Sequence, residues 1–417
     1  MSDRLAHFRK SPPNLMTFDD LKLSSASLRA VKELGHTEPT PVQAAAIPPA
    51  LAGRDLLASA ATGSGKTAAF ILPILDALAD GKPGSVRALI VAPTRELALQ
   101  ITEHATALAK HTKLRITAIY GGVGFGPQAA AIRRGTDIVV ATPGRLLDHL
   151  TQATFSLNSI EHFVLDEADR MLDMGFLPDV RRIVKRLPAK RRTMLFSATM
   201  PPAIVILSKE LLKDPLRIDL TVHGKPAEGI TQTVYTVDQS RKGDLLLELL
   251  KGNEIFSALA FTRTKARANR LATLLERNKI PVERIHGNRS QAQRTHALSQ
   301  FKRGKCRVLV ATDIAARGID ILQLGHVVNF DVPLVPEDYI HRVGRTARAK
   351  AIGDAITFVS KDEEASFAQI ERKLGKRIDR AKTPELPQLA ATVPPLRARA
   401  PLARAPQART RTGRSWR

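Results

Sequence analysis

The sequence is poor in cysteine, in acidic residues and in long apolar runs, and each shortage narrows what the protein can be. Cys306 is the only cysteine among 417 residues, so no internal disulfide can form, and no Cys/His cluster has the spacing of a zinc site. No apolar stretch approaches the length of a membrane span. The opening residues, MSDRLAHFRK, lack the apolar core of a signal peptide. We therefore expect a soluble cytoplasmic protein with no membrane partner.

The shortage of acidic residues leaves a large positive charge. Lys and Arg total 64 against 40 Asp and Glu, which gives a net charge of +24. A charge of this size favours polyanionic partners, with nucleic acid first and an anionic membrane second. Plain solubility is the alternative interpretation. With 43% hydrophobic residues, the chain is long enough for two domains with separate cores.

Short apolar runs alternate with helical patterns along the whole chain. Runs that are apolar on both faces and joined by helices are typical of parallel sheets in an α/β fold. Strands are expected at 55–60, 87–93, 137–143, 162–169 and 193–199, and again at 230–238, 257–264, 282–287, 306–313, 326–331 and 354–360. Helices are expected at 66–79, 94–110, 265–279 and 290–304. The pattern predicts two α/β domains in tandem.

Composition also suggests where these domains begin and end. A polar segment rich in Gly and Pro, residues 221–229, predicts a linker. After residue 382 the chain turns to Pro, Ala and Arg without periodicity, which is typical of a disordered basic tail. The predicted division is an N-terminal extension (1–17), a first domain (18–220), the linker (221–229), a second domain (230–382) and the tail (383–417).

The stretch ATGSGKT, residues 61–67, lies between a predicted strand and a predicted helix, as a P-loop requires. Its backbone N–H groups and the following helix N-terminus favour bound phosphate. Lys66 can reach the β- and γ-phosphates, and the Thr67 hydroxyl can bind Mg²⁺. The nucleotide-binding residues expected in this loop are Ala61, Thr62, Gly63, Ser64, Gly65, Lys66 and Thr67.

The stretch HFVLDEADR places three carboxylates directly after an apolar strand. Charge at the end of a buried strand is costly unless it is paired. Next to a P-loop the arrangement has a purpose: Asp166 can hold Mg²⁺, and Glu167 can position and deprotonate the water that attacks the γ-phosphate. The alternative is an acidic helix start stabilised by the helix dipole.

Taken together, these motifs resemble the DEAD-box RNA helicases of superfamily 2, over roughly Phe18 to Lys373, and most closely the bacterial RhlE branch. The resemblance implies two RecA-like parallel-sheet domains that close on ATP and Mg²⁺. PTPVQ looks like the adenine-reading Q motif, in which Gln43, Phe18 and His36 meet the nucleotide. A glutamine amide can pair with both N6 and N7 of adenine. His36 replaces the usual aromatic residue, Ala61 replaces glutamine, and Ala347 replaces glycine.

The resemblance assigns further roles to residues of both domains. Asp169, Ser197, Thr199 and His341 would couple the domains, Asp320 would meet the ribose, and Arg345 and Arg348 would be arginine fingers completing the catalytic set with Lys66 and Glu167. RNA contacts are expected from Thr94, Arg95, Gly122, Thr142, Gly144, Arg145, Arg263, Gln291, Arg294 and Thr312. Taken singly, several of these motifs also have a purely structural interpretation, such as a basic face exposed to solvent.

We therefore expect a monomeric ATP-dependent RNA helicase that unwinds short duplexes or remodels RNA. Recognition would run through the RNA backbone with little sequence specificity. Ribosomal or other RNA–protein complexes are conceivable partners. Two alternatives stay open from sequence: an ATPase that clamps RNA without unwinding it, and a non-catalytic RNA-binding protein with a relic ATP site. The presence of Lys66, Thr67, Asp166 and Glu167 argues against the relic.

Overall fold

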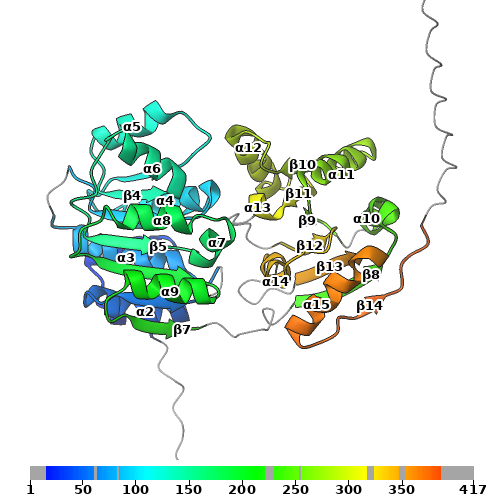
Figure 1. The fold of residues 1–417 in the computed structure, drawn as a ribbon, viewed down its shortest axis with the longest axis horizontal. Coiled ribbons are helices and arrows are strands. Elements are labelled where there is room, and N and C mark those ends of the chain that lie inside the picture. The colour runs from blue at the N-terminus through cyan, green and yellow to red at the C-terminus, as the bar shows by residue number, and fades with distance from the viewer. Residues whose placement is uncertain are drawn as a thin grey trace, which may run out of the picture.

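The computed structural model describes residues 16–60, 63–81, 84–220, 230–252, 255–316, 324–346 and 353–386. These residues form two lobes that lie side by side, each built around one sheet (Figure 1). Each sheet has seven strands, and all of its pairings are parallel. The predicted α/β fold with two parallel-sheet domains is therefore confirmed.

The first sheet has the strand order β3-β4-β2-β5-β6-β1-β7. Its strands are β1 (Leu56–Ser59), β2 (Ala88–Val91), β3 (Ile116–Ile119), β4 (Ile138–Ala141), β5 (His162–Leu165), β6 (Arg192–Ser197) and β7 (Leu216–Asp219). The helices of this lobe are η1 (Asp19–Leu21), α1 (Ser25–Glu33), α2 (Pro41–Leu51), α3 (Lys66–Leu78), α4 (Arg95–Leu108), α5 (Phe125–Arg133), α6 (Pro143–Thr151), α7 (Ala168–Asp173), α8 (Leu177–Val184) and α9 (Pro202–Leu211).

The second sheet has the order β10-β11-β9-β12-β13-β8-β14. Its strands are β8 (Ile230–Thr236), β9 (Ala258–Thr262), β10 (Val282–Ile285), β11 (Val308–Thr312), β12 (His326–Asn329), β13 (Gly353–Val359) and β14 (Arg380–Ala381). The helices of this lobe are η2 (Gln239–Arg241), α10 (Lys242–Lys251), α11 (Lys265–Arg277), α12 (Gln291–Lys302), α13 (Asp313–Ala316), α14 (Pro336–Val343), η3 (Lys361–Glu363) and α15 (Glu364–Leu374).

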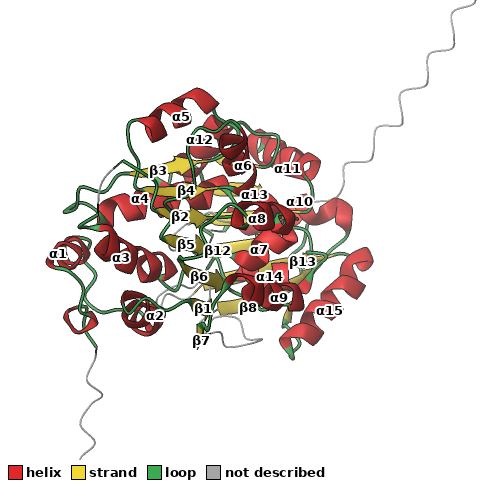
Figure 2. Cartoon of the chain, turned by 60° about the vertical axis from the view of Figure 1, so that its left-hand side comes forward, coloured by secondary structure: helices red, strands yellow, loops and turns green. Residues whose placement is uncertain are grey.

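Helices cover both faces of each sheet (Figure 2), so the central strands are buried along their whole length. In β2, Ala88 and Ile90 pack into one apolar cluster with α3 and α4. Leu89 and Val91 pack into another cluster with α6 and α8 on the opposite face. The central strands are continuous apolar runs because alternate side chains point to opposite faces of the sheet and both faces are covered by helices.

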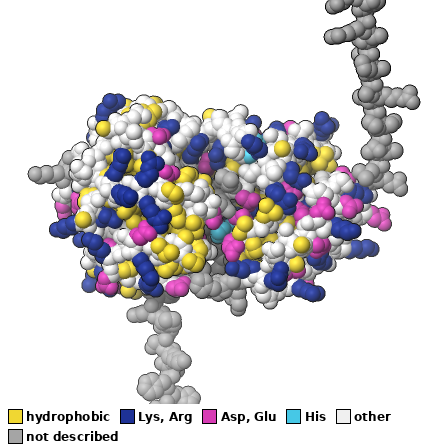
Figure 3. Space-filling view, viewed as in Figure 1, with side chains coloured by type: hydrophobic (Ala, Val, Ile, Leu, Met, Phe, Trp, Pro, Cys, Tyr) yellow, Lys and Arg dark blue, Asp and Glu magenta, His cyan; other side chains and the backbone are white. Residues whose placement is uncertain are grey.

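The described residues stop short of some predicted segments. Residues 1–15, the predicted linker 221–229 and most of the predicted tail, from residue 387, lie outside them. Within the described part of the chain, no helix combines the length and the apolar character needed to cross a membrane. Lys and Arg side chains stand on both lobes on the face drawn in Figure 3.

A buried ion pair joins the starts of two central strands of the first sheet. Arg87 Nη2 lies 3.0 Å from Asp137 Oδ1, and Arg87 Nη1 also donates to the carbonyl oxygen of Leu78 at 3.1 Å. The second oxygen of Asp137 accepts from the Arg115 N–H at 2.9 Å. Both side chains are buried, so the guanidinium depends on this carboxylate to balance its charge.

Asp137→Ala should therefore lower the free energy of unfolding by about 3–5 kcal/mol, because it leaves a buried guanidinium unpaired. Urea unfolding of the whole chain would measure the change. The control is Glu210→Ala, which breaks the exposed pair between Arg181 and Glu210 in the same lobe and should barely alter stability. Equal effects of the two substitutions would contradict this account of Asp137.

Candidate functional site

Three candidate motifs meet because their strands are neighbours. β5, β6 and β1 lie side by side in the first sheet. The P-loop follows β1, the acidic stretch follows β5, and the Ser197–Thr199 segment begins at the end of β6. In a parallel sheet all carboxyl ends lie at one edge, where ligands of open α/β sheets bind. The strand order therefore brings together residues that are far apart in the sequence.

The P-loop backbone has the conformation that its glycines permit. Gly63 and Gly65 have φ values of +82° and +91°, a region that side chains with a Cβ disfavour. A Cβ on Gly65 would also lie 2.6 Å from Gln43 Nε2. Gly65 is the N-cap of α3, so the loop ends on the N-terminus of a 13-residue helix. Ala61 and Thr62 lie outside the described residues.

Lys66 and Asp166 face one another at the base of this loop. Lys66 Nζ donates to the carbonyl oxygen of Ala60 at 3.2 Å and lies 3.9 Å from Asp166 Oδ1. Asp166 is only 2% exposed, and burial raises its pKa to about 6 in spite of the nearby Lys66 charge. Within the described chain, neither Asp166 Oδ1 nor Ser64 Oγ has a hydrogen-bond partner. Thr67, the second residue of α3, is half-buried.

Buried polar atoms without partners are uncommon in folded proteins. Carboxylate and hydroxyl oxygens are the ligands that Mg²⁺ prefers. The orphaned oxygen of Asp166 and the hydroxyl of Thr67 therefore fit the predicted metal ion in the chemistry of their donor atoms.

Glu167 is held in a strained position between positive charges. Its φ is +55°, a left-handed conformation that is unusual for a residue with a side chain. Arg170 Nη1 donates to Glu167 Oε2 at 2.6 Å. Burial alone would raise the pKa of Glu167. The charges of Arg170, Lys66 and Arg345 outweigh burial and hold that pKa below its ordinary value, so the carboxylate stays ionised at neutral pH.

The third carboxylate ties the acidic stretch to the end of β6. Asp169 Oδ2 accepts from the Thr199 N–H at 2.8 Å and from its hydroxyl at 2.9 Å. Ser197 Oγ accepts from the Asp169 N–H at 3.1 Å and donates to the Thr199 carbonyl oxygen at 2.8 Å. Burial would raise the pKa of Asp169, but the Thr199 hydrogen bonds and the charges of Lys66 and His341 lower it.

Two of the charges that lower these pKa values belong to the other lobe. His341 lies in α14, and Arg345 follows that helix. Both are close enough to the acidic stretch to lower the pKa of a carboxylate there. The structure thus brings the predicted coupling residues of the two domains together. Asp320 and Arg348 lie outside the described residues.

Gln43 lies directly against the P-loop. Its Nε2 donates to the carbonyl oxygen of Gly65 at 3.1 Å, and its Oε1 accepts from the Thr40 N–H at 2.9 Å. An amide group has two donor hydrogens and two acceptor lone pairs. One donor hydrogen and one acceptor lone pair of Gln43 are therefore left. They match the acceptor N7 and the donor N6 of adenine.

The other two predicted adenine contacts are placed differently. Phe18 is buried in the apolar core of the first lobe. His36 is exposed, and its ring centroid lies 6.2 Å from that of His104 in an edge-on arrangement. Of the two, His36 has the surface that a stacked base would need.

The predicted RNA contacts of the first lobe follow β2, β3 and β4 at the same edge of the sheet. Thr94 Oγ1 accepts from the Leu97 N–H and so caps α4. Arg95 occupies the space over Gly122, where a Cβ would lie 1.9 Å from its Nη1. Arg145 Nη1 donates to the Val123 carbonyl oxygen at 3.1 Å.

The remaining two expected contacts of this lobe lie at the start of α6. Thr142 is the N-cap of that helix and is buried. A Cβ on Gly144 would meet open space. Both residues therefore lie at a helix N-terminus, whose backbone N–H groups favour phosphate, and of the two Gly144 is exposed.

Three of the four predicted RNA contacts of the second lobe, Gln291, Arg294 and Arg263, bond to protein groups. Gln291 Nε2 donates to Glu96 Oε1 at 3.1 Å, and Arg294 Nη2 lies 3.0 Å from Glu96 Oε2. Because Glu96 belongs to α4, these contacts join the two lobes. Arg263 Nη2 donates to Glu363 Oε1 at 2.9 Å, and Thr312 ends β11 half-buried.

Sequence reasoning missed Glu96 and Arg170 as members of the site. Glu96 stands inside the PTRELA motif and Arg170 directly follows the acidic stretch. Position was therefore a signal for both. The partner of Glu96 was not predictable, because Gln291 lies 195 residues further along the sequence.

Comparison with known proteins agrees with this geometry. Residues 40–206 match the model of the DEAD/DEAH box helicase family, and residues 241–350 match that of the helicase conserved C-terminal domain. The chain is 41% identical over 371 residues to the DEAD-box ATP-dependent RNA helicase CshA of Bacillus subtilis, covering 89% of this chain and 75% of CshA. It is also 41% identical to the ATP-dependent RNA helicase DbpA of the same organism, covering 90% and 78% of the two chains.

Solved structures add the arrangement of the domains. S. cerevisiae Dbp5 bound to RNA and ADP BeF3 superposes with a TM-score of 0.80 at 31% identity, covering 88% of this chain and 96% of that one. A Dbp5 variant bound to Nup159, a Gle1 variant, IP6 and ADP gives 0.61 at 30% identity over 87% and 96%. The whole chain therefore superposes better on Dbp5 bound to RNA and ADP BeF3 than on this second complex.

The shared motifs, the sequence identity and the paired sheets lead to one conclusion. This chain belongs to the DEAD-box ATP-dependent RNA helicases.

Proposed function

We propose that this helicase hydrolyses ATP between its two lobes and uses their closure to hold one RNA strand and separate it from its partner. The observation that carries the proposal is the contact between the lobes, in which Gln291 and Arg294 of the second lobe bond to Glu96 of the first. The charge of Arg345, also from the second lobe, lowers the pKa of Glu167, so the second lobe would influence hydrolysis when the lobes are together. Unwinding of short duplexes and remodelling of folded RNA are both consequences of that linkage.

Hydrolysis would be divided among a few side chains. Glu167 is ionised and held by Arg170, so it can orient the attacking water and accept its proton. Lys66 would meet the β- and γ-phosphates. Arg345, together with Arg348, would offset negative charge on the transferred group. Phosphoryl transfer depends mainly on such positioning and electrostatics.

Asp166 and Thr67 would hold Mg²⁺. When bound, the ion would neutralise charge on the phosphate oxygens. Burial raises the pKa of Asp166, and the charge of Lys66, 3.9 Å from Oδ1, only partly offsets that effect. Nearby positive charge favours the ionised carboxylate, which is the form that binds a metal ion.

Adenine would be read by the free donor and acceptor of Gln43, with His36 stacking on the base and Asp320 meeting the ribose. RNA would lie along Thr94, Arg95, Gly122, Thr142, Gly144 and Arg145 of the first lobe and Arg263, Gln291, Arg294 and Thr312 of the second. Backbone N–H groups, hydroxyls and arginines read phosphates rather than bases. This supports binding with little sequence specificity.

Several finer statements complete the proposal. The domains would run from 18 to 220 and from 230 to 382, between the N-terminal extension (1–17), the linker (221–229) and the basic tail (383–417). We infer a monomer that acts in the cytoplasm, with ribosomal or other RNA–protein complexes as partners. Assignment to the RhlE branch rests on residues 285–294 and 308–321 and stays a prediction, since the relatives described above are CshA and DbpA.

Glu167→Gln should keep ATP and RNA binding but lose turnover, because Asp166 remains while the base is gone. RNA-stimulated phosphate release, measured beside equilibrium binding of both ligands, checks this. Glu161→Gln, at the other end of β5, is the matched control and should hydrolyse ATP normally. Normal steady-state turnover by Glu167→Gln would remove the role given to Glu167.

The wild type should hydrolyse ATP in preference to GTP, and Gln43→Ala should erode that preference. A bidentate amide–adenine pair is worth about 1–3 kcal/mol of discrimination. The measurement is the ratio of kcat/KM for the two nucleotides. Thermal unfolding controls for the lost cap on α2, to which Gln43 contributes. Equal wild-type rates with ATP and GTP would contradict the assignment.

Arg345→Ala should slow RNA-stimulated hydrolysis by about 10³-fold or more, as removal of an arginine finger does elsewhere. ATP binding by the whole chain without RNA should change little, since the P-loop belongs to the other lobe. Arg372→Ala, an exposed change on α15, should have no effect. A loss in kcat below about tenfold would show that Arg345 does not stabilise the transferred phosphate.

A further inference from the structure

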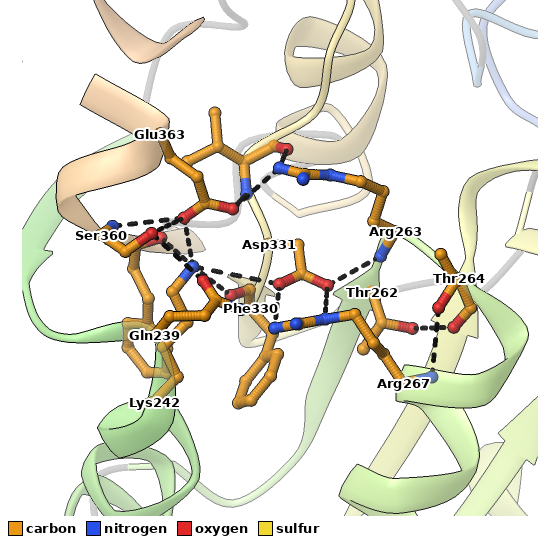
Figure 4. Close-up of polar contacts among 12 residues, drawn as sticks. Gln239, Lys242, Thr262, Arg263, Thr264, Arg267, Phe330, Asp331, Ser360 and Glu363 are labelled. Carbon is orange, nitrogen blue, oxygen red and sulfur yellow. Dashed lines mark hydrogen bonds and ion pairs between the residues drawn. The ribbon is translucent and has the colours of Figure 1, made fainter. Parts of the chain in front are cut away.

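The second lobe contains a cluster of charges built on buried side chains to which the proposed reaction assigns no role, namely Lys242, Asp331 and Glu363. They gather at the carboxyl end of the second sheet, between α10, α11 and η3 (Figure 4). We call them the charge cluster, and its members are Lys242, Arg263, Arg267, Asp331 and Glu363. Three cations and two carboxylates give it a net charge of +1. Buried charges are costly even when paired, so a cluster of this size calls for an explanation.

Lys242 is the centre of the charge cluster. It begins α10 and is 0% exposed. Its ammonium donates to the carbonyl oxygens of Phe330 at 2.9 Å and Phe358 at 3.0 Å, and to the carboxylate of Glu363. Burial lowers the pKa of Lys242, and the charge of Glu363 opposes that effect. One ammonium thus joins a helix start to the ends of two neighbouring strands, β12 and β13.

On one side the charge cluster fixes Arg263. Glu363 Oε1 accepts from Arg263 Nη2 at 2.9 Å, and Asp331 Oδ2 accepts from the Arg263 main-chain N–H at 2.9 Å. Asp331 Oδ2 also accepts from Arg267 Nε at 2.7 Å. The side chain of Arg263 is still 39% exposed. The cluster therefore anchors a cation that remains available to a phosphate.

On the other side the charge cluster reaches α14. Arg342 Nη1 donates to the Asp331 carbonyl oxygen at 2.6 Å. The same guanidinium pairs with Asp313 through Nε at 2.5 Å and Nη2 at 2.8 Å. Arg342 follows His341 in α14 and precedes Arg345 by three residues. Asp331 thus lies between the predicted RNA contact and the helix that carries residues acting on the acidic stretch.

We propose that the charge cluster positions Arg263 and α14 together, so that RNA at Arg263 and nucleotide at Arg345 favour each other through Asp331 and Glu363. This inference rests on the proposed function. A phosphate at Arg263 competes with Glu363 for the guanidinium and alters the balance of charge around Lys242. Because Lys242 and Asp331 also fix the segment that receives Arg342, that change reaches α14. Lys242, Asp331 and Glu363 are positioning residues in this scheme.

The test compares two neighbouring glutamates. Glu363→Gln keeps the shape and one acceptor oxygen for Lys242 but removes the charge. Glu364→Gln is the matched control, because that carboxylate pairs on the surface with Arg380 at 2.8 Å. RNA affinity is measured with AMP-PNP and with ADP. The dissociation constant for RNA with ADP, divided by that with AMP-PNP, gives the coupling. Glu363→Gln should lower this ratio by roughly two- to thirtyfold, and Glu364→Gln should leave it unchanged.

A merely structural role would weaken RNA binding equally with both nucleotides, and an unchanged ratio would overturn the proposal. If Glu363→Gln does not fold, the test is Arg263→Ala. Because Arg263 is the partly exposed member of the charge cluster, its substitution must also lower the ratio. With both variants folded, the double variant should show less than the sum of the single effects on RNA affinity; strict additivity would also overturn the proposal. Absence of RNA-stimulated hydrolysis by the wild type would instead refute the proposed function.

Discussion

The carboxylates of Asp166 and Glu167 stand at the end of a buried strand, where ionisation depends on nearby positive charge. Glu167 has Arg170 at 2.6 Å, whereas Lys66 Nζ lies 3.9 Å from Asp166 Oδ1. Glu167 is therefore ionised, as the proposed base must be, and Asp166 has an oxygen that a metal ion would fit. Burial and unequal pairing give adjacent residues different chemistry.

The same need for compensating charge draws the lobes together. The charge of Arg345 lowers the pKa of Glu167 in the other lobe, and Arg294 pairs with Glu96 across the lobes. Both effects rest on charged groups, which water can solvate if the lobes separate. Interfaces of this polar kind permit relative motion of domains. The proposed closure on ATP and RNA would use that freedom.

The sequence predicted the central strands well, because strands covered on both faces are apolar throughout. It missed β3, β7 and β14, which lie at sheet edges or contain only two residues. The partly exposed β3 and the alternating LRID of β7 give weak signals. Motif order predicted which loops form the site. It could not predict that Gln291 and Arg294 hold Glu96, or that Lys242 lies within 4 Å of Asp331 and Glu363, because only the fold brings these residues together.

The hydrogen bond from Gln43 to the Gly65 carbonyl oxygen has a consequence for fidelity. The amide proposed to read the base also touches the loop that would hold the phosphates. Guanine presents an acceptor where adenine presents a donor, so it would turn an attractive contact with Gln43 Oε1 into a repulsive one. Relief of that repulsion would displace the amide and, through Gly65, the phosphate loop. A mismatched nucleotide would then be rejected through misalignment during turnover, and selectivity would be expressed in kcat as well as in KM.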